Sequence, residues 1–287
     1  MEKDIIFLDD DPFAPENHIY RVKNILFSGR SEYQDVKVVE FEWFGLALVL
    51  DNVVQFTEAE EFIYHETLAH IPLFTHPNPK NVLIIGGGDC GVAREVLKHK
   101  SVEKLILVDL DKMVTEVSKK YFYDLFKGAF EDKRLRIINE DGLKFVKEYD
   151  GDKFDVVMID LTDPVGPAKP LFEEPFYRMV HNILTDDGIM AAQTESIWYH
   201  QETVIGVQKA LKNVFPIVDV AYFITPIYTG YWWTISIGSK KYNPRTDYRS
   251  SFLNNKYYSD DVRNVSFLPQ SLYDRLLEGR LFKESLR

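Results

Sequence analysis

The chain has 287 residues, of which 45% are hydrophobic and 28% are charged, a composition that excludes a disordered or fibrous protein. It contains 34 Lys and Arg residues against 45 Asp and Glu residues, so its formal net charge is −11. This charge argues against a nucleic-acid partner, which needs a basic face, and suits either a cationic small molecule or simple solubility.

Residues 1–57 consist of short segments rich in β-branched and aromatic side chains, separated by turn sequences. This pattern predicts strands at residues 19–27, 36–41 and 46–50. Because the connections are too short for a helical crossover, we expect the strands to pair as antiparallel hairpins. The sequence therefore predicts a small N-terminal antiparallel β domain.

From residue 58 onward, predicted strands and helices alternate. Unbroken apolar runs such as 82–85 are typical of parallel strands covered on both faces. The predicted strands cover residues 82–85, 105–108, 136–138, 155–159, 189–192 and 234–237. The predicted helices cover residues 60–74, 92–98, 113–121, 175–184 and 202–214. This alternation predicts a doubly wound α/β domain over residues 58–287, and no pattern assigns the segment after residue 242.

A glycine-rich loop follows the first strand of this domain and opens the next helix. Gly86, Gly88 and Gly91 match the G-x-G-x-x-G pattern of nucleotide-binding loops. Asp109 ends the following strand, where an acid can bind ribose hydroxyls. The agreement of loop, strand, helix and distal acid predicts nucleoside binding, and a purely structural turn is the alternative.

Asp89 lies inside this loop and bears on the type of nucleoside. A nicotinamide cofactor would place its pyrophosphate on the backbone amides of the loop, where a carboxylate repels it by about 4 kcal/mol at ~4 Å and an effective dielectric of about 20. The same carboxylate attracts a sulfonium or an ammonium group. We therefore expect a cationic nucleoside.

Further carboxylates follow the predicted strands. Asp160 ends the strand at residues 155–159, Asp163 follows in a loop rich in Pro and Gly, and Asp141 precedes Gly142. Open α/β sheets bind ligands at this edge, and carboxylates gathered there need a cation. Asp141 as a helix cap, Asp163 as a turn residue and a calcium or magnesium site are the alternatives.

Aromatic and histidine side chains form a third group of candidates. Tyr64 and His65 lie on the predicted helix at residues 60–74, where a buried, hydrogen-bonded histidine is the alternative to a functional one. Four aromatic residues lie close to Gly230, namely Tyr228, Tyr231, Trp232 and Trp233. They belong either to the core or to a site where aromatic rings face a cation.

Cysteine content and hydropathy bear on the cellular compartment. Cys90 is the single cysteine, so the chain can form neither an internal disulfide nor a cysteine-rich zinc site. No run approaches the ~18 apolar residues of a membrane span, and the N-terminus lacks the pattern of a signal peptide. We expect a cytoplasmic protein without a membrane partner.

Several stretches together resemble the spermidine synthase family, the polyamine aminopropyltransferases. The matching stretches are LDNVVQ at 50–55, EFIYHETLAH at 61–70, VLIIGGGDCG at 82–91 and DLTDPVGPA at 160–168. The resemblance implies a Rossmann-like domain of the methyltransferase type behind the β domain, in a homodimer or homotetramer. It implies aminopropyl transfer from decarboxylated S-adenosylmethionine, a co-substrate, to putrescine, giving spermidine and methylthioadenosine with no metal and no bound cofactor.

The resemblance also implies roles for individual residues. Asp160 matches the base that takes a proton from the attacking amine. The residues that match amine-binding positions are Tyr64, His65, Asp89, Asp163 and Tyr228, with Gln193 near the same pocket. The residues that match positions around the nucleoside are Gln34, Gly86, Gly88, Asp109, Asp141, Gly142 and Pro167.

The sequence departs from the family pattern at a few positions. Cys90 stands where a glycine is usual, Asp109 replaces a glutamate, Leu161 replaces a small hydroxyl residue, and the loop after Tyr228 lacks a proline and is one residue shorter. Because that loop borders the acceptor, agmatine, norspermidine and spermidine stay open as acceptors. A methyltransferase is a further alternative, although Asp89 would repel the carboxylate of intact S-adenosylmethionine. A catalytically inactive member would lack Asp160 or Asp163, and both are present.

Overall fold

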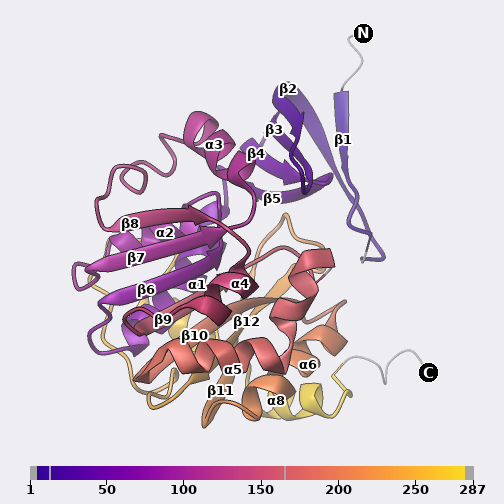
Figure 1. Ribbon diagram of the computed structural model, residues 1–287. Coiled ribbons are helices and arrows are strands. Elements are labelled where there is room, and N and C mark those ends of the chain that lie inside the picture. Colours follow the sequence, from indigo (N-terminus) through magenta and orange to yellow (C-terminus); the bar gives the residue numbers. More distant parts are fainter. Residues whose placement is uncertain (1–4, 13, 165, 282–287) are drawn as a thin grey trace.

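The computed structural model describes residues 5–12, 14–164 and 166–281, which form two sheets and their helices (Figure 1). The first sheet has five antiparallel strands in the order β1-β2-β3-β4-β5. Their bounds are β1 Ile5–Asp9, β2 His18–Arg30, β3 Asp35–Phe41, β4 Gly45–Leu50 and β5 Val53–Thr57. The predicted antiparallel β structure is confirmed, and β1 and β5 are additional strands.

A two-residue turn joins β4 to β5. Leu50 pairs with Val53 across it, and the intervening Asp51 and Asn52 have φ values of 47° and 67°. Two successive left-handed residues match the twist of a tight hairpin, and Asp and Asn tolerate this conformation better than most residues.

The second sheet has seven strands in the order β11-β12-β10-β9-β6-β7-β8. The strands are β6 Asn81–Gly86, β7 Lys104–Asp109, β8 Leu135–Asn139, β9 Phe154–Asp160, β10 Leu184–Ser196, β11 Ile217–Ile224 and β12 Trp232–Ser239. Strands β6 to β10 pair in parallel, whereas β12 is antiparallel to β10 and β11. The sheet is Rossmann-like with an antiparallel extension at one edge.

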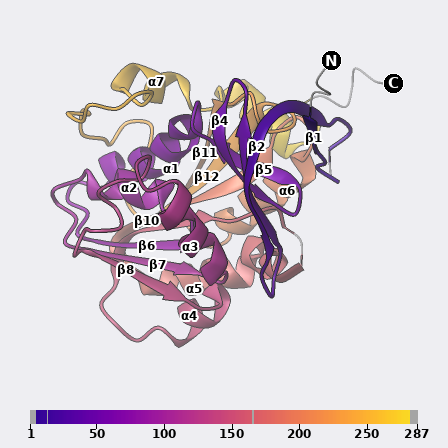
Figure 2. The same cartoon turned by 90° about the horizontal axis from the view of Figure 1, so that it is seen from above.

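Helices cover both faces of this sheet (Figures 1 and 2). They are α1 Glu61–Thr75, α2 Gly91–Leu97, α3 Lys112–Tyr121, α4 Gly142–Glu148, α5 Glu174–Ile183, α6 Gln201–Lys212, α7 Asp260–Val265 and α8 Gln270–Leu277, with a 3-10 helix η1 at Gly166–Phe172. The predicted α/β class and its five predicted helices are confirmed. None of the helices within the described residues has the length and apolarity needed to cross a bilayer.

The apolar run of β6 supplies two hydrophobic cores. Val82 and Ile84 belong to the core on one face of the sheet, which also contains residues of α1 and α2. Leu83 and Ile85 belong to the core on the other face, with residues of α5 and α6. Because successive side chains of a strand point to opposite faces, a strand buried on both sides has no polar position.

A third core joins the N-terminal sheet to α3. Val36 and Phe56 of the N-terminal sheet pack against Val114 of α3 and Phe122 just after it. Asp111 links the same parts through hydrogen bonds. Its carboxylate caps α3 through the Met113 amide at 2.9 Å and accepts a hydrogen bond from Gln34 Nε2 at 2.9 Å. The N-terminal sheet is thereby held over the carboxyl edge of the large sheet.

Candidate active site

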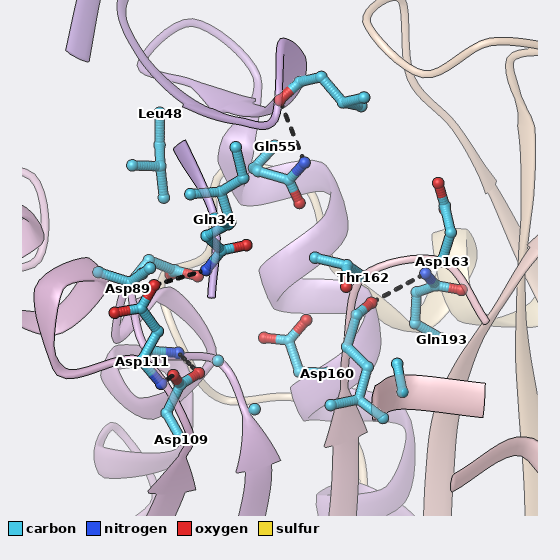
Figure 3. A pocket seen from close by; sticks show the side chains of 18 of the residues that line it. Gln34, Leu48, Gln55, Asp89, Asp109, Asp111, Asp160, Thr162, Asp163 and Gln193 are labelled. Carbon is cyan, nitrogen blue, oxygen red and sulfur yellow. Dashed lines mark hydrogen bonds between the residues drawn. The ribbon is translucent and has the colours of Figure 1, made fainter. Parts of the chain in front are cut away.

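A cavity of about 570 Å³ lies between the N-terminal sheet and the carboxyl edge of the large sheet. The predicted site residues that line it are Gln34, Tyr64, His65, Gly86, Gly88, Asp89, Asp109, Asp141, Gly142, Asp160, Asp163, Gln193 and Tyr228. Pro167 lies in η1, and its side chain falls outside the described residues. Figure 3 shows Asp160 between Asp89 and Asp109 on one side and Asp163 and Gln193 on the other.

The glycine loop packs directly against the end of β9. Gly86 pairs with Asp160 in the sheet, and Gly86 and Gly87 have φ values of 82° and 65°. A Cβ atom on Gly86 would lie 1.9 Å from the carbonyl oxygen of Asp160, and one on Gly87 would lie 2.9 Å from its Oδ2. Glycine is therefore required for this backbone to approach the carboxylate.

Cys90 ends the same loop and directly precedes α2. Its φ of 72° is left-handed, and its side chain is fully buried. A cysteine thus adopts the conformation that the usual glycine would adopt without strain.

Asp109 contacts the loop from the end of β7. Its carboxylate accepts hydrogen bonds from the Gly88 amide at 2.9 Å and the Asp111 amide at 2.8 Å. Burial raises the pKa of Asp109 to about 6, although these two amides oppose the rise. A Cβ on Gly88 would lie 2.7 Å from this carboxyl group. The aspartate side chain, although shorter than the glutamate usual at this position, therefore reaches the loop.

Asp160 occupies the middle of the cavity. The hydroxyl of Tyr64 donates a hydrogen bond to its Oδ1, and its buried Oδ2 has no partner among the described residues. Burial and the charge of Asp89 raise the pKa of Asp160 to about 7, although His65 and Tyr64 lower it. A carboxylate with an unpartnered oxygen and a pKa near neutrality is suited to accept a proton.

His65 lies between two carboxylates. Its Nδ1 is 2.7 Å from Oε2 of Glu61, and its Nε2 is 3.6 Å from Oδ1 of Asp89. Burial lowers the pKa of His65, but the hydrogen bond with Glu61 and the charge of Asp89 outweigh it and raise the value to about 9. This arrangement suits an imidazolium, which presents an N–H to each carboxylate. Asp89 also accepts the Gly91 amide at 2.6 Å.

A second pair of carboxyl groups lies on the far side of Asp160. Burial raises the pKa of Asp163, and burial together with the charge of Asp163 raises the pKa of Glu195 well above its usual range. The two side chains are hydrogen-bonded to each other, as expected for two acids that share one proton. Gln193 accepts the Glu195 amide at 2.7 Å, which supports the left-handed Glu195 backbone with its φ of 74°.

The aromatic candidates divide into two groups. Tyr228 and Trp233 line the cavity, with ring centroids 4.8 Å apart. The Tyr228 hydroxyl donates to the backbone oxygen of Gln55 at 2.7 Å, so its ring forms a fixed wall. Tyr231 and Trp232 are not among the lining residues.

Asp141 lies at the edge of the cavity and also caps a helix, the two positions that the sequence left open for it. It lines the cavity and also caps α4 by accepting the Lys144 amide at 2.9 Å. The helix-cap alternative is therefore confirmed, and Asp141 also lies in the cavity wall, where its proposed role at the nucleoside stays a prediction.

The sequence reading missed several acids that lie in or beside the cavity. Asp9, Asp11 and Asp111 line it, and Glu195 lies behind Asp163. Burial raises the pKa of Asp9 to about 7. The run of three aspartates at residues 9–11 is a signal that could have drawn attention to the N-terminus, whereas nothing local marks Glu195. The described residues contain no cluster of three or more His, Cys, Asp or Glu side chains arranged to hold a metal ion.

Comparisons with known proteins agree with this geometry. The chain matches the spermine/spermidine synthase domain over residues 61–249 and the spermidine synthase tetramerisation domain over residues 6–58. It is 53% identical to polyamine aminopropyltransferase 1 of Aquifex aeolicus (strain VF5) over 277 residues, covering 96% of this chain and 98% of the relative. It is 44% identical to the polyamine aminopropyltransferase of Methanocaldococcus jannaschii over 263 residues, covering 88% and 89%.

Solved structures give the same result. A spermidine synthase in complex with the transition state analogue AdoDATO has a TM-score of 0.90 and 34% identity, covering 96% of this chain and 95% of the other. The spermidine synthase of Thermotoga maritima has a TM-score of 0.89 and 33% identity at the same coverage. The chain therefore belongs to the spermine/spermidine synthase family.

Proposed function

We propose that this enzyme transfers the aminopropyl group of decarboxylated S-adenosylmethionine to putrescine, with Asp160 as the base. The observation that carries the proposal is the state of Asp160. Its Oδ2 is buried without a partner among the described residues, and its pKa is raised to about 7. This carboxylate can attract an ammonium group and also take its proton near neutral pH.

We infer that the donor nucleoside binds along the ends of β6 and β7. Asp109 lies where an acid binds ribose hydroxyls, and Gln34 and Asp141 line the same part of the cavity. Asp89 would hold the ammonium of the aminopropyl arm. The donor is a co-substrate, and the proposed reaction needs neither a metal nor a bound cofactor.

In the proposed reaction the acceptor ammonium first transfers one proton to Asp160. The freed nitrogen lone pair then forms a bond to the carbon attached to the sulfonium sulfur. The carbon–sulfur bond breaks with its electron pair moving to sulfur, so methylthioadenosine leaves as a neutral thioether and the product carries a secondary ammonium. Holding both cations in line within an acidic cavity contributes several kcal/mol, because the alignment is established before reaction.

The acceptor's second ammonium is assigned to the acids beyond Asp160. The charge of Asp11 contributes to the raised pKa of both Asp163 and Glu195. A dication can be neutralised there without burying an isolated charge. Putrescine has the two ammonium groups that this arrangement requires, and longer amines or agmatine are the alternatives.

Intact S-adenosylmethionine is the less favourable donor. Its α-carboxylate would face Asp89 and Asp160, and each such contact costs about 4 kcal/mol at ~4 Å and an effective dielectric of about 20. Methyl transfer on the same fold is therefore disfavoured by the charges lining the cavity.

The test is a transfer assay with decarboxylated S-adenosylmethionine and a panel of amines. Purified protein is incubated with putrescine, cadaverine, agmatine, norspermidine or spermidine, and methylthioadenosine and the new polyamine are separated by chromatography. The proposal predicts the highest kcat/KM with putrescine. A higher kcat/KM with another amine would overturn the acceptor assignment and leave aminopropyl transfer standing.

We also infer that the enzyme is a homo-oligomer. The match to a tetramerisation domain covers the first sheet, and the edge hairpin of β1 and β2 carries exposed apolar side chains. Leu8 pairs with Ile19, and Ile6, Leu8 and Ile19 are 62%, 47% and 65% exposed. Such a patch on an edge hairpin is typical of an interface. Sedimentation equilibrium should give a multiple of 33.5 kDa, and a monomer would contradict the inference.

A further inference from the structure

A buried carboxylate–arginine pair lies behind the histidine of the active site. Glu61 is fully buried at the start of α1, and both of its oxygens bind Arg94 of α2. Arg94 Nη1 lies 2.9 Å from Oε1, and Nη2 lies 2.8 Å from Oε2. This two-pronged geometry fixes the position and the ionised state of the carboxylate. None of the steps assigned above uses either residue.

Glu61 in turn determines the state of His65. Its Oε2 is 2.7 Å from Nδ1 of His65 and accepts a hydrogen bond from that nitrogen. The other ring nitrogen, Nε2, points to Asp89 at 3.6 Å. A neutral imidazole has one N–H and would turn a lone pair toward one of the two carboxylates, whereas an imidazolium presents an N–H to both.

The surroundings of His65 restrict the ring to this position. Phe56 of β5 and Phe126 pack against it with centroids 5.9 Å and 5.8 Å away. A Cβ on Gly91 would lie 2.2 Å from the ring, so the loop and the histidine are in direct contact. The charged and titratable groups that face His65 are Glu60 and Glu61 at the start of α1, Tyr64 beside it, Asp89 from the loop, Arg94 from α2 and Asp160 from β9.

We propose that Glu61, held by Arg94, is a positioning residue that keeps His65 as an imidazolium directed at Asp89. Asp89 is then oriented toward the aminopropyl ammonium, and the positive charge of His65 favours ionised Asp160. In this arrangement His65 acts through Asp89 rather than on the amine itself. The effect on turnover rests on the proposed aminopropyl transfer, whereas the protonation state of His65 does not.

The wild-type enzyme gives the first test. In protein labelled with ¹⁵N-histidine, the ring resonances of His65, assigned by their loss in His65→Gln, are followed from about pH 6 to about pH 10. We expect both ring nitrogens to stay protonated to about pH 8, because the pKa of His65 is raised to about 9. A neutral ring at pH 7 would overturn the proposal whether or not the protein transfers aminopropyl groups.

The variant Glu61→Gln supplies the second test and Glu95→Gln its matched control. Glu95 is also buried and binds Arg94, with Oε1 2.6 Å from Nε, but it does not contact His65. In Glu61→Gln we expect His65 to titrate near its ordinary pKa of about 6.5 or below, where about one-tenth is protonated at pH 7.5, so kcat/KM falls about tenfold or more. The alkaline limb of the pH profile should move down by about 2.5 pH units or more, from about 9 to about 6.5 or below, and Glu95→Gln should leave this limb at its wild-type position.

These readouts separate positioning from loss of packing. A purely structural role would lower the melting temperature of both variants and leave the pH profile and the His65 resonances in place. That result would contradict the proposal. If Glu61→Gln does not fold, the wild-type titration still decides it. Absence of methylthioadenosine release by the wild-type enzyme would instead remove the proposed function and leave the titration result valid.

Discussion

The hydroxyl of Tyr64 donates a hydrogen bond to Oδ1 of Asp160, so a side chain of α1 holds the carboxylate at the end of β9. This contact leaves the other carboxylate oxygen directed at the cavity. It also lowers the pKa of Asp160 and partly offsets the rise that burial causes. Orientation and ionisation of the proposed base therefore depend on a residue 96 positions away in the sequence.

The variant Tyr64→Phe tests this contact. A hydrogen bond to a charged group contributes about 1.5–3 kcal/mol, so we expect kcat/KM to fall roughly 10- to 100-fold. The acid limb of the pH profile should also move to higher pH, because the lost hydrogen bond lowered the pKa of Asp160. Tyr121→Phe, which removes a hydroxyl bound to the Leu26 carbonyl far from the cavity, is the control. Wild-type kinetics in Tyr64→Phe would contradict the role of this bond.

The buried charge of Asp160 should reduce the stability of the fold. Its pKa rises from 3.8 to about 7 on folding, so the folded protein binds this proton more tightly than the unfolded chain does. The free energy of unfolding therefore decreases as pH rises from about 4 to about 7 and changes no further from this group above that range. Asparagine at position 160 does not ionise, so the Asp160→Asn variant does not lose this part of its free energy of unfolding as the pH rises.

We expect Asp160→Asn to melt at a higher temperature than the wild type at about pH 8, and the difference to vanish near pH 4. Scanning calorimetry of both proteins across this range measures it. A variant that is equally or less stable than the wild type at pH 8 would show that ionised Asp160 does not destabilise the fold.

Arg263 should stabilise the packing of the C-terminal segment against α1. Its guanidinium is fully buried and donates to the Ile71 carbonyl at 3.2 Å, to the Thr75 hydroxyl at 2.7 Å and to the Pro244 carbonyl. Each buried carbonyl left unpartnered costs about 1–3 kcal/mol. Arg263→Met is therefore expected to lower the free energy of unfolding by about 3 kcal/mol in urea titrations.

A surface substitution provides the comparison for Arg263→Met. Lys112 forms an exposed pair with Glu116 at 3.1 Å, and such pairs contribute about 0.3–0.5 kcal/mol. Lys112→Ala should change stability by no more than that. Equal effects of the two substitutions would mean that the buried guanidinium does not anchor the segment.

Removal of divalent ions should leave the activity unchanged. Asp109 accepts hydrogen bonds from two backbone amides and Asp89 from one, and Oδ1 of Asp160 accepts a hydrogen bond from the Tyr64 hydroxyl. These carboxylates are therefore positioned by hydrogen bonds within the protein and need no metal ion to hold them. We expect equal rates before and after dialysis against EDTA. Loss of activity that a single divalent ion restores would instead assign the acidic edge to a metal.

Local patterns were sufficient to predict most of the large sheet. The apolar run of β6, the glycine loop and Asp160 at the end of β9 each follow from residues adjacent in the chain, and the topology then brings their ends together. The predicted cavity residues depend only on this rule. Their roles at the amine and the nucleoside stay predictions.

Contacts between distant segments could not be predicted in this way. Glu66 of α1 accepts three backbone amides from Lys256, Tyr257 and Tyr258, an arrangement with no local signature that holds the segment the sequence left unassigned. Helices α7 and α8 have six and eight residues, too few to form without tertiary contacts. The Glu61–Arg94 pair spans 33 positions, and on sequence alone Glu61 is only an acid in the first turn of a helix.

The most direct test of aminopropyl transfer compares the wild type with Asp160→Asn, using putrescine and either decarboxylated or intact S-adenosylmethionine at about pH 8. Methylthioadenosine and spermidine are measured by chromatography. We predict equal amounts of both products from the wild type with the decarboxylated donor alone, and a rate about 10²- to 10⁴-fold lower in the variant, as for loss of a general base. Turnover only with the intact donor, or an undiminished rate in Asp160→Asn, would contradict the account.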